Sequence, residues 1–395
     1  MKSYNEEALK NDPKANFGRP YKQCTISVMD TIADPDITFD EKGVSNYYKE
    51  FKKAKEQNVF NGEKGKQKLV DLVNQIKSKG KNKKYDCITG VSGGVDSTYV
   101  ALKAKELGLR PLIVHFDNGW NSETANKNIE NIIKNTGFDL YTLVVDWNEF
   151  RDLQRAYFKA NVVDIEALTD HAIICTLYKL AIEHNIEFIL SGANVVTEQI
   201  LPRHWIWGKT DGKNIQAIHQ EYGEVKLKTF PTYSAFKFEL FKKRKGLRSV
   251  RILDYMEYNK KQAKSEIQEK LGWKDYGGKH FESVFTRFYQ GYILPVKFGI
   301  DKRKAHLSTL IFDGQLTKEY ALEQLQLPIY DPDLMREDYE FVRKKLGFSE
   351  EEFMNYFKAP RVEHSSFEHD KRNIWENYPL FKVVKPLWKI IKKVK

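Results

Sequence analysis

The chain has 395 residues, of which 41% are hydrophobic and 30% are charged, as in a globular protein large enough for two or three domains. A formal net charge of +11 favours anionic partners, such as nucleotides, sugar nucleotides, nucleic acids or a membrane surface. Three widely separated cysteines exclude a disulfide framework and indicate a reducing compartment. The polar start and the lack of a long apolar run predict a cytoplasmic protein.

An irregular segment is expected over residues 1–60, and a lysine-rich amphipathic helix over residues 67–79. Short apolar runs then predict strands at residues 85–91, 111–116, 140–145 and 187–191, with helical stretches between them. Strands that alternate with helices predict an α/β fold with a doubly wound parallel sheet. Ligands bind such sheets at the carboxyl ends of the strands, so the loops that follow these strands are the candidate site loops.

The alternation ends after Asn194. Residues 197–250 are rich in aromatic and basic side chains, and the sequence from about Asn259 is expected to be mainly helical. Ser349 and Glu352 have the spacing of a capping box, and Phe348 with Phe353 has that of a hydrophobic staple, so a helix is expected to begin there.

The most specific motif is Ser92-Gly93-Gly94-Val95-Asp96-Ser97, between the first expected strand and the helix that follows. Glycine permits a tight turn and close approach of the backbone to a ligand. Loop amides, two hydroxyls and a helix N-terminus together favour an anion. A carboxylate fits there as a ligand of Mg²⁺ that bridges to phosphate. The sequence is not a Walker A motif, and the alternative interpretation is a plain Gly-Ser turn.

The loop resembles the PP-loop of the ATP pyrophosphatases, which hold pyrophosphate and leave AMP on the substrate. This resemblance places adenine recognition at the second strand and its exit, at Phe116. The alternative is an ordinary strand-to-helix turn, because Asp-Asn-Gly at 117–119 is a sequence common in turns of any protein. It places a nucleotide-contacting glycine at Gly192, after the fourth strand. Nearby residues expected to face the substrate are Asp117, Asn118, Asn194 and Glu198.

Basic residues in the C-terminal part are further candidates. Lys279 follows two glycines, which suits a loop that closes over an anion. Arg287 and the cluster at 302–304 have the charge to hold phosphate, and a solvated basic face is the alternative. His171, in a mainly apolar helical stretch, is interpreted as a structural group, and Cys175 is expected to be buried.

Together these segments resemble the N-acetyl sugar amidotransferases of bacterial surface-glycan and nonulosonic acid pathways. The resemblance rests on residues 29–31 and 34–40, the loop at 92–97, residues 117–120 and 192–194, and two C-terminal blocks at 277–288 and 297–308. It implies that ATP, with Mg²⁺, adenylates an acetamido carbonyl oxygen and that ammonia then displaces AMP to give an acetamidino group. The implied domains are a degenerate zinc-ribbon-like segment (1–60), a PP-loop ATP pyrophosphatase domain (61–230) and a mainly helical substrate or partner region (231–395).

The resemblance also implies roles for individual residues. Asp96, Lys279 and Arg303 would be catalytic, with Asp96 also holding Mg²⁺. The sugar or sugar nucleotide would be bound by Asp117, Asn118, Asn194, Glu198 and Arg287. The residues expected to bind ATP are Ser92, Gly93, Gly94, Asp96, Ser97, Phe116, Gly192 and Lys297.

The N-terminal segment departs from the pattern of this family. Relatives commonly carry two Cys-x-x-Cys pairs there, and the matching residues here are Cys24, Ser27, Ser45 and Tyr48. Structural zinc sites normally need four ligands, so we predict that the segment holds no zinc and that Tyr48 fills the vacated space.

None of the cysteines stands in a glycine-flanked nucleophile setting, so ammonia is expected from a separate glutaminase subunit. The runner-up interpretation is a tRNA-modifying PP-loop enzyme, which the basic charge favours and the lack of paired cysteines disfavours. A nucleotide-binding module without catalysis is the third, disfavoured by the intact loop. The leading interpretation involves no nucleic acid.

Overall fold

The computed structural model describes residues 6–12, 16–278, 281–329 and 331–370. Five strands form one parallel sheet in the order β3-β2-β1-β4-β5. The strand order reverses between β1 and β4, which makes this pair the switch point of a doubly wound sheet. The predicted α/β fold is therefore confirmed. The strands are β1 (Cys87–Gly90), β2 (Pro111–Asp117), β3 (Leu140–Val144), β4 (Phe188–Ser191) and β5 (Arg248–Arg251).

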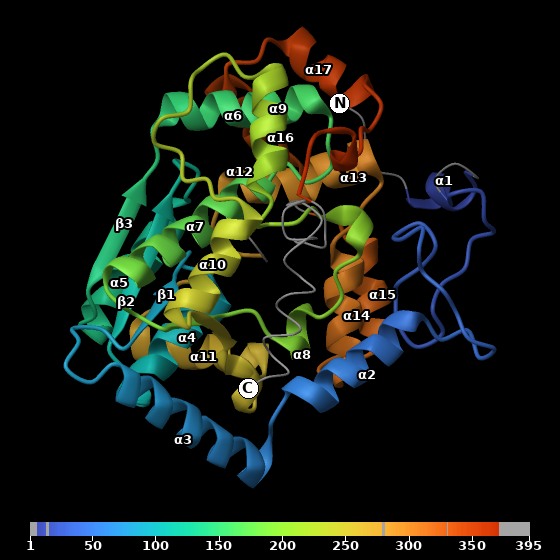
Figure 1. Ribbon diagram of the computed structural model, residues 1–395. Helices are drawn as coiled ribbons and strands as arrows, with labels where there is room; N and C mark the ends of the chain where they lie inside the picture. The colour runs from blue at the N-terminus through green and yellow to red at the C-terminus, as the bar shows by residue number, and fades with distance from the viewer. Residues whose placement is uncertain (1–5, 13–15, 279–280, 330, 371–395) are drawn as a thin grey trace, which may run out of the picture.

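Helices cover both faces of the sheet (Figure 1). Neighbouring residues of β1 show the division, because Cys87 packs into one hydrophobic cluster and Ile88 into another. Side chains alternate between the faces of a strand, so a sheet covered on both faces needs both to be apolar. The Cys87 face is covered by α3 (Gly62–Lys79), α4 (Val95–Glu106), α5 (Glu123–Thr136) and α11 (Lys260–Leu271), and the Ile88 face by α7 (Ala167–Glu183) and α10 (Ala235–Lys245).

Local sequence signals set several helix ends. Ser122 caps α5 by accepting a hydrogen bond from Ala125 N at 3.2 Å, and Gly137 ends it with φ 74°. The predicted capping box is present at the start of α17 (Glu350–Lys358). The rings of Phe348 and Phe353 stack with their centroids 5.7 Å apart, so the hydrophobic staple is confirmed as well.

The fifth strand was not expected from the sequence. β5 is short, lies at the edge of the sheet and reads Arg-Ser-Val-Arg, without the apolar run that marks a buried strand. It pairs in parallel with β4, from Phe188 opposite Arg248 to Ser191 opposite Arg251. The sheet thus includes residues beyond 230, which is the predicted end of the ATP domain. The domain boundaries themselves stay predictions.

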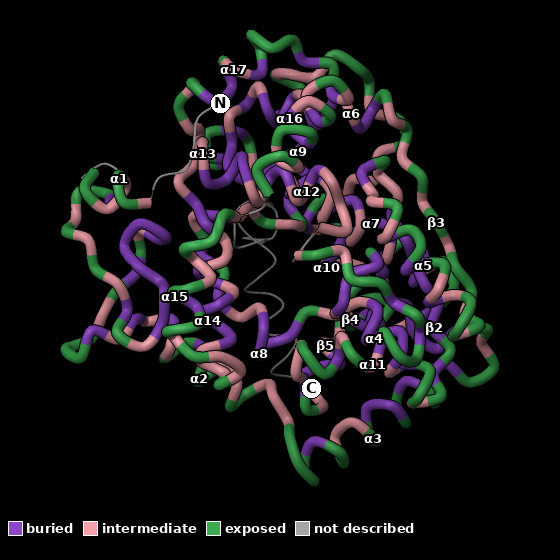
Figure 2. The backbone as a smooth tube through the Cα atoms, turned by 180° about the vertical axis from the view of Figure 1, so that it is seen from behind, coloured by how far each residue is buried: buried purple, intermediate pink, exposed green. Residues whose placement is uncertain are grey.

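The C-terminal helices pack around a second, aromatic core that lies outside the sheet. Figure 2 shows its inner segments as buried, between α6, α12 and α16. α12 runs directly into a π-helix at Tyr289–Ile293. The remaining helices are α1 (Glu6–Lys10), α2 (Asn46–Asn58), α6 (Trp147–Ala160), α8 (Val195–Glu198), α9 (Gly212–Tyr222), α12 (Val284–Phe288), α13 (Leu294–Phe298), α14 (Arg303–Asp313), α15 (Lys318–Gln326) and α16 (Pro332–Leu346), with 3-10 turns at Arg203–Trp205, Ile252–Tyr255 and His364–Ser366.

A buried ion pair joins the N-terminal segment to α14. Lys304 is 1% exposed, and its Nζ lies 2.5 Å from Asp30 Oδ2 and 3.3 Å from Glu6 Oε1. Asp30 is itself fully buried. Lys304 belongs to the basic cluster at 302–304 that was predicted to be available for phosphate, but its ammonium is enclosed in this pair. The pair therefore fixes the N-terminal segment against the C-terminal helices.

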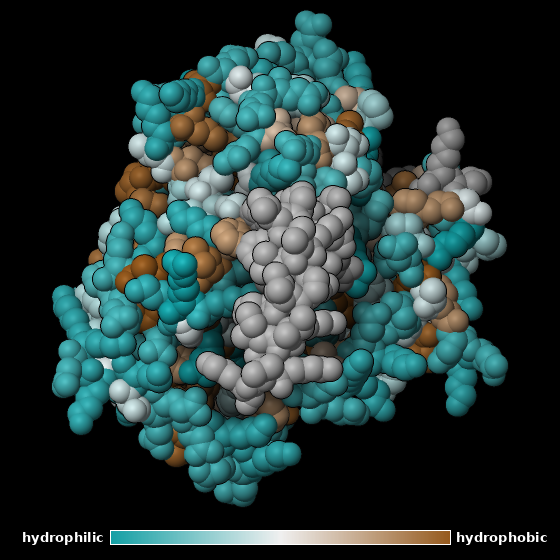
Figure 3. All heavy atoms as spheres, viewed as in Figure 1, coloured by the Kyte–Doolittle hydropathy of each residue, from teal (hydrophilic) through white to brown (hydrophobic). Residues whose placement is uncertain are grey.

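Hydrophilic residues predominate among the coloured atoms of the face in Figure 3. Within the described ranges, no helix has both the length and the apolar character needed to cross a bilayer.

We predict that Lys304→Met destabilises the protein by about 3–5 kcal/mol, because the buried Asp30 carboxylate loses its counter-ion. Lys344→Met is the matched control: Lys344 is 69% exposed and pairs with Glu340 on the surface of its own helix, so a change of at most about 1 kcal/mol is expected. The free energy of unfolding in urea measures both. Equal effects of the two substitutions would contradict the account of the buried pair.

Candidate active site

The phosphate loop leaves the carboxyl end of β1 and enters α4, at the switch point of the sheet. Gly93 has φ +78°, and a Cβ there would lie 2.7 Å from the carbonyl oxygen of Ala125, so only glycine fits without strain. The Gly93 carbonyl accepts hydrogen bonds from Trp273 Nε1 at 2.8 Å and from Asn128 Nδ2 at 3.4 Å. The turn is therefore held from outside the loop as well as by its own backbone.

Two serine hydroxyls flank the turn and line the cavities beside it. Gly94 N donates to Ser92 Oγ at 3.3 Å, and Ser97 Oγ donates to Gly94 O at 3.3 Å. Gly94 is also the N-cap of α4, so the positive end of the helix dipole lies at the loop. Hydroxyls, amides and a helix N-terminus converge here, which is the composition of an anion site.

The carboxylate of Asp96 lines the same cavity and has two partners. It accepts a hydrogen bond from the Tyr258 hydroxyl, and Lys260 Nζ lies 3.3 Å away. Burial, with the Asp96 charge, raises the pKa of Tyr258 above its ordinary range, so this hydroxyl remains a donor. The carboxylate and serine oxygens are ligands that Mg²⁺ accepts. In the described parts of the chain, no three carboxylate, imidazole or thiolate groups lie close enough together to hold a metal.

A cavity of about 570 Å³ lies between the loop and the start of α11, and we call it the phosphate-side cavity. Lys260 and Lys264, one helical turn apart, line it together with Lys261 and His306. These residues carry no distinctive signal in the sequence, because lysines at this spacing are frequent in so basic a chain. Its lining residues are Ser92, Gly94, Val95, Asp96, Ser97, Gly192, Glu198, Lys260, Lys261, Lys264, Trp273, Asp275, Tyr276, Gly277, Gly278, Glu282 and His306.

A second cavity, of about 700 Å³, opens at the carboxyl ends of β1, β2 and β4, and we call it the nucleotide-side cavity. It shares Ser92, Ser97, Gly192 and Glu282 with the phosphate-side cavity, so the two meet at the loop. A Cβ at Gly192 would lie 3.1 Å from the carbonyl carbon of Asp96, which shows how closely the β4 exit approaches the loop. The predicted residues Phe116 and Asn118 line this second cavity.

Away from the strand ends, the nucleotide-side cavity is lined by apolar side chains, such as Ile173 and Trp205, and by several polar ones. Lys209 there pairs with Asp164 at 2.6 Å and with Asp170 at 3.0 Å. Glu166 faces Thr286, whose hydroxyl donates to its Oε1 at 2.5 Å. These groups could not be predicted from the sequence, because residues 164–170 and 286–290 meet only through the tertiary fold.

Three predicted basic residues line neither cavity. Arg287 forms a bidentate pair with Asp338, at 2.6 and 2.7 Å. Arg303 binds Asp301 and three carbonyl oxygens at the end of α15. Lys297 donates to Asn161 Oδ1 at 3.0 Å and to the carbonyls of residues 356 and 359. The geometry gives these three side chains packing partners and does not support the predicted roles of Arg303 in catalysis, Lys297 in ATP binding and Arg287 in sugar binding.

Of the other predicted residues, some line a cavity and others make structural hydrogen bonds beside it. Glu198 lines the phosphate-side cavity. Asn194 is buried and caps α8, accepting from Thr197 N at 2.9 Å, and Asp117 accepts from Gly119 N at 2.9 Å in the turn after β2. Lys279 lies outside the described residues.

His171 and Cys175 are buried, as expected. Lys209 O binds His171 Nδ1 at 2.9 Å, and Tyr233 N donates to Nε2 at 3.1 Å. Burial lowers the pKa of His171 to about 4 and raises that of Cys175 to about 12, so the thiol stays protonated. The structural interpretation of His171 is confirmed.

Three of the four residues at the expected zinc positions lie together. Ser45 N donates to Cys24 Sγ at 3.3 Å. Burial raises the pKa of Cys24, but hydrogen bonds from Ser27 and Ser45 more than offset it, so the pKa is lowered. Tyr48 packs against Phe312, with ring centroids 5.2 Å apart. The segment thus keeps a cysteine and two serines close together where relatives carry thiolates.

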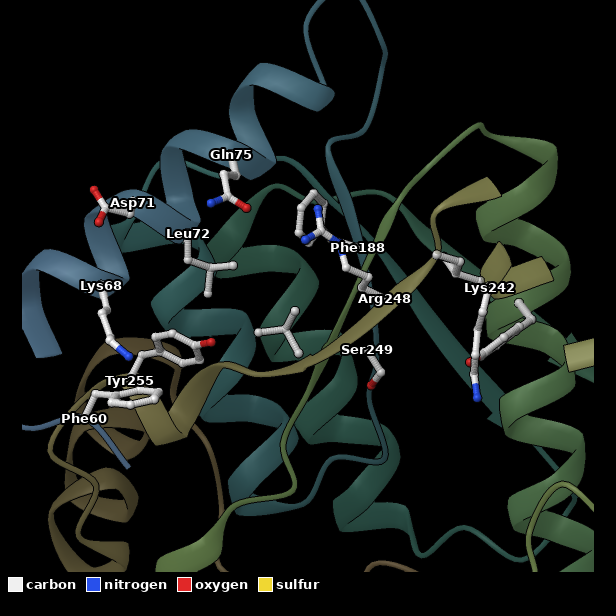
Figure 4. Close-up of a pocket in the computed structure, with 13 residues that line it drawn as sticks. Phe60, Lys68, Asp71, Leu72, Gln75, Phe188, Lys242, Arg248, Ser249 and Tyr255 are labelled. Atoms are coloured by element: carbon white, nitrogen blue, oxygen red, sulfur yellow. The ribbon is translucent and has the colours of Figure 1, made fainter. Parts of the chain in front are cut away.

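A third cavity, of about 790 Å³, opens between α3, α10 and the outer edge of β5. Figure 4 shows Lys68, Lys242 and Arg248 around it, beside Phe60 and Tyr255. It contains no residue of the phosphate loop, and so it is separate from the site described above.

A doubly wound parallel sheet with Ser-Gly-Gly-x-Asp-Ser at its switch point defines the chain as a PP-loop α/β protein. Residues 282–383, about a quarter of the chain, match the family model described as "LPS biosynthesis protein WbpG-like, C-terminal domain". The matched range includes part of the C-terminal blocks on which the predicted resemblance rests. No curated protein matches the chain.

Solved structures with likeness to the chain include an NH3-dependent NAD synthetase from Campylobacter jejuni, at 12% identity and TM-score 0.30, covering 75% of this chain and 98% of that one. An NMN synthetase from Francisella tularensis has 13% identity and TM-score 0.27, covering 57% and 92%. A predicted tRNA methyltransferase subunit from Methanocaldococcus jannaschii has 17% identity and TM-score 0.26, covering 46% and 76%. Likeness at this level does not bear on activity.

We predict that the purified protein contains no zinc, because one cysteine and two hydroxyls are a poor ligand set for this metal. Elemental analysis is the measurement. Zinc in a one-to-one ratio with protein would refute the prediction.

We predict that Gly94→Val lowers ATP affinity at least about tenfold, because the added methyl groups enter the anion cradle. Gly94 has φ −73°, so the backbone accepts a side chain, and the melting temperature should change little. Gly94→Ala is the graded control: its Cβ lies 3.1 Å from Ser92 Oγ, and a smaller loss is expected. Titration calorimetry with ATP gives the affinities. Unchanged binding in the valine variant would place ATP elsewhere.

Proposed function

We propose that the protein is an AMP-forming amidotransferase, which adenylates the carbonyl oxygen of an N-acetyl sugar and replaces this oxygen with nitrogen from ammonia. The observation that carries the proposal is the Ser92–Ser97 loop at the switch point, with the Asp96 carboxylate in its anion-binding cavity. This loop lacks the Walker A lysine, and its sequence resembles the PP-loop of enzymes that release pyrophosphate.

The two adjoining cavities suit a nucleotide on one side and its departing phosphates on the other. Phe116 and Asn118 would meet the adenosine, and the loop would hold the phosphates. The α-phosphate would then lie near Ser97 and Gly192, where the cavities meet. An acetamido oxygen in the nucleotide-side cavity could attack it there.

The leaving pyrophosphate carries the developing negative charge. Lys260 and Lys264 on α11, with the amides of the loop, would stabilise this charge. Asp96 would hold Mg²⁺, which supplies further neutralisation of the phosphate oxygens when bound. Lys260 already pairs with Asp96, so this lysine would be positioned before the nucleotide binds.

Ammonia would come from a separate glutaminase. All three cysteines are buried, which disfavours a thiolate nucleophile on this chain. The match of residues 282–383 to a lipopolysaccharide biosynthesis domain supports a surface-glycan sugar, free or nucleotide-linked, as the acceptor.

We predict that the purified chain forms AMP, pyrophosphate and an amidino sugar from ATP and a UDP-linked N-acetyl sugar when ammonium is added, but not with glutamine alone. A panel of UDP-N-acetyl sugars with mass spectrometry detects the replacement of oxygen by NH. Asp96→Asn should fold normally and lose at least about a hundredfold in pyrophosphate release. Formation of ADP, or wild-type turnover by Asp96→Asn, would contradict the proposal.

A further inference from the structure

Glu166 stands directly before α7 and lines the nucleotide-side cavity. Its side chain makes no capping hydrogen bond to its own helix. One carboxylate oxygen accepts from Thr286 Oγ1 at 2.5 Å and the other from Gln290 Nε2 at 3.5 Å. The carboxylate is therefore held at the cavity by residues distant in sequence.

The element that carries Gln290 has unusual backbone geometry. Residues Tyr289–Ile293 form a π-helix directly after α12. Single π-turns inserted in helical runs occur frequently at functional sites. Thr286 and Gln290, four residues apart, both reach Glu166 across this junction. The π-turn thus interrupts the regular helix where the side chains of Thr286 and Gln290 are directed at Glu166.

The charges around Glu166 come from several elements. Burial and the nearby Asp170 on α7 raise its pKa, while Thr286, Lys302 and Lys209 act in the opposite direction, and together they bring the pKa from the ordinary 4.5 to about 7. Lys209 is already engaged by Asp164 and Asp170, at 2.6 and 3.0 Å. Tyr289 lies near as well, and the Asp164 and Glu166 charges help raise its pKa.

We propose that Glu166 is the general base of the amination step, accepting a proton from ammonium at the nucleotide-side cavity. The inference rests on the proposed function. Ammonium transfers one proton to the carboxylate, and the freed nitrogen lone pair attacks the imidate carbon. The bond from this carbon to the AMP oxygen then breaks, its electron pair leaves with AMP, and the amidino group remains. A base that titrates near neutrality suits this transfer.

The rival role for Glu166 is binding of a sugar hydroxyl, and the two roles differ in which half-reaction they affect. Adenylation is measured as sugar-dependent exchange of labelled pyrophosphate into ATP, without any amine. Amination is measured with ammonium chloride and, separately, with hydroxylamine, which is mostly unprotonated at neutral pH. The sugar is the UDP-N-acetyl sugar that supports exchange in the wild type.

For Glu166→Gln we expect exchange and the KM for sugar to stay within about twofold of the wild type, and the ammonium rate at neutral pH to fall about a hundredfold. Hydroxylamine should restore the rate, because it needs no base. The wild-type rate at fixed total ammonium should level off above about pH 7, as Glu166 becomes ionised, whereas the variant rate should continue to rise with free ammonia. Glu183→Gln, at the exposed far end of α7, is the matched control and should behave as wild type.

Folding of the variant is checked by a second readout. Above pH 4.5 the unfolded chain loses the Glu166 proton before the folded one does, so wild-type stability declines until about pH 7. Glu166→Gln removes this decline, so the variant should have a higher melting temperature than the wild type at pH 8 but not at pH 4. Loss of exchange with a raised sugar KM, or a wild-type ammonium rate, would overturn the proposal. Absence of exchange in the wild type would instead overturn the proposed function.

Discussion

The turn at Gly93 is the constraint on which the rest of the site depends. Its positive φ and the nearby Ala125 carbonyl leave no room for a side chain. Asn128 then links the turn to the segment after α11: it donates to Gly93 O, and its amide exchanges hydrogen bonds of 2.9 and 2.7 Å with the backbone of Lys274. This connection brings residues 258–278 over the loop, so that Tyr258 and Lys260 reach Asp96.

Both cavities contain lysines that are paired with carboxylates, but the pairs differ. On the phosphate side Lys260 pairs with Asp96 and Lys264 with Asp275, where negative charge would leave with pyrophosphate. On the nucleotide side the cation Lys209 is neutralised by two aspartates, and Glu166 remains hydrogen-bonded to neutral groups. A nucleophile that arrives as a cation would meet carboxylates there. The two cavities meet at the phosphate loop, whose residues Ser92 and Ser97 line both of them.

The sheet and its loop could be predicted from the sequence because their signals are local. Apolar runs marked β1 to β4, and the motif at 92–97 carries its turn, hydroxyls and helix N-terminus in six consecutive residues. β5 gave no such signal, since an edge strand with an arginine at each end and a single valine between them has no apolar run. Arg287 and Arg303 were selected for their charge, yet a guanidinium binds a buried carboxylate as readily as a phosphate, and sequence does not distinguish the two. Glu166, Thr286 and Gln290 meet only in the folded chain.

The central claim is that the α-phosphate of ATP, held at the Ser92–Ser97 loop, activates a carbonyl oxygen. Labelling the acetamido oxygen of the sugar with a heavy isotope tests it most directly, because each mechanism sends this oxygen to a different product. The account predicts that the label appears in the phosphate of AMP and that pyrophosphate carries none. Label in inorganic phosphate, or its retention in the sugar while ATP is consumed, would contradict activation through an adenylated intermediate.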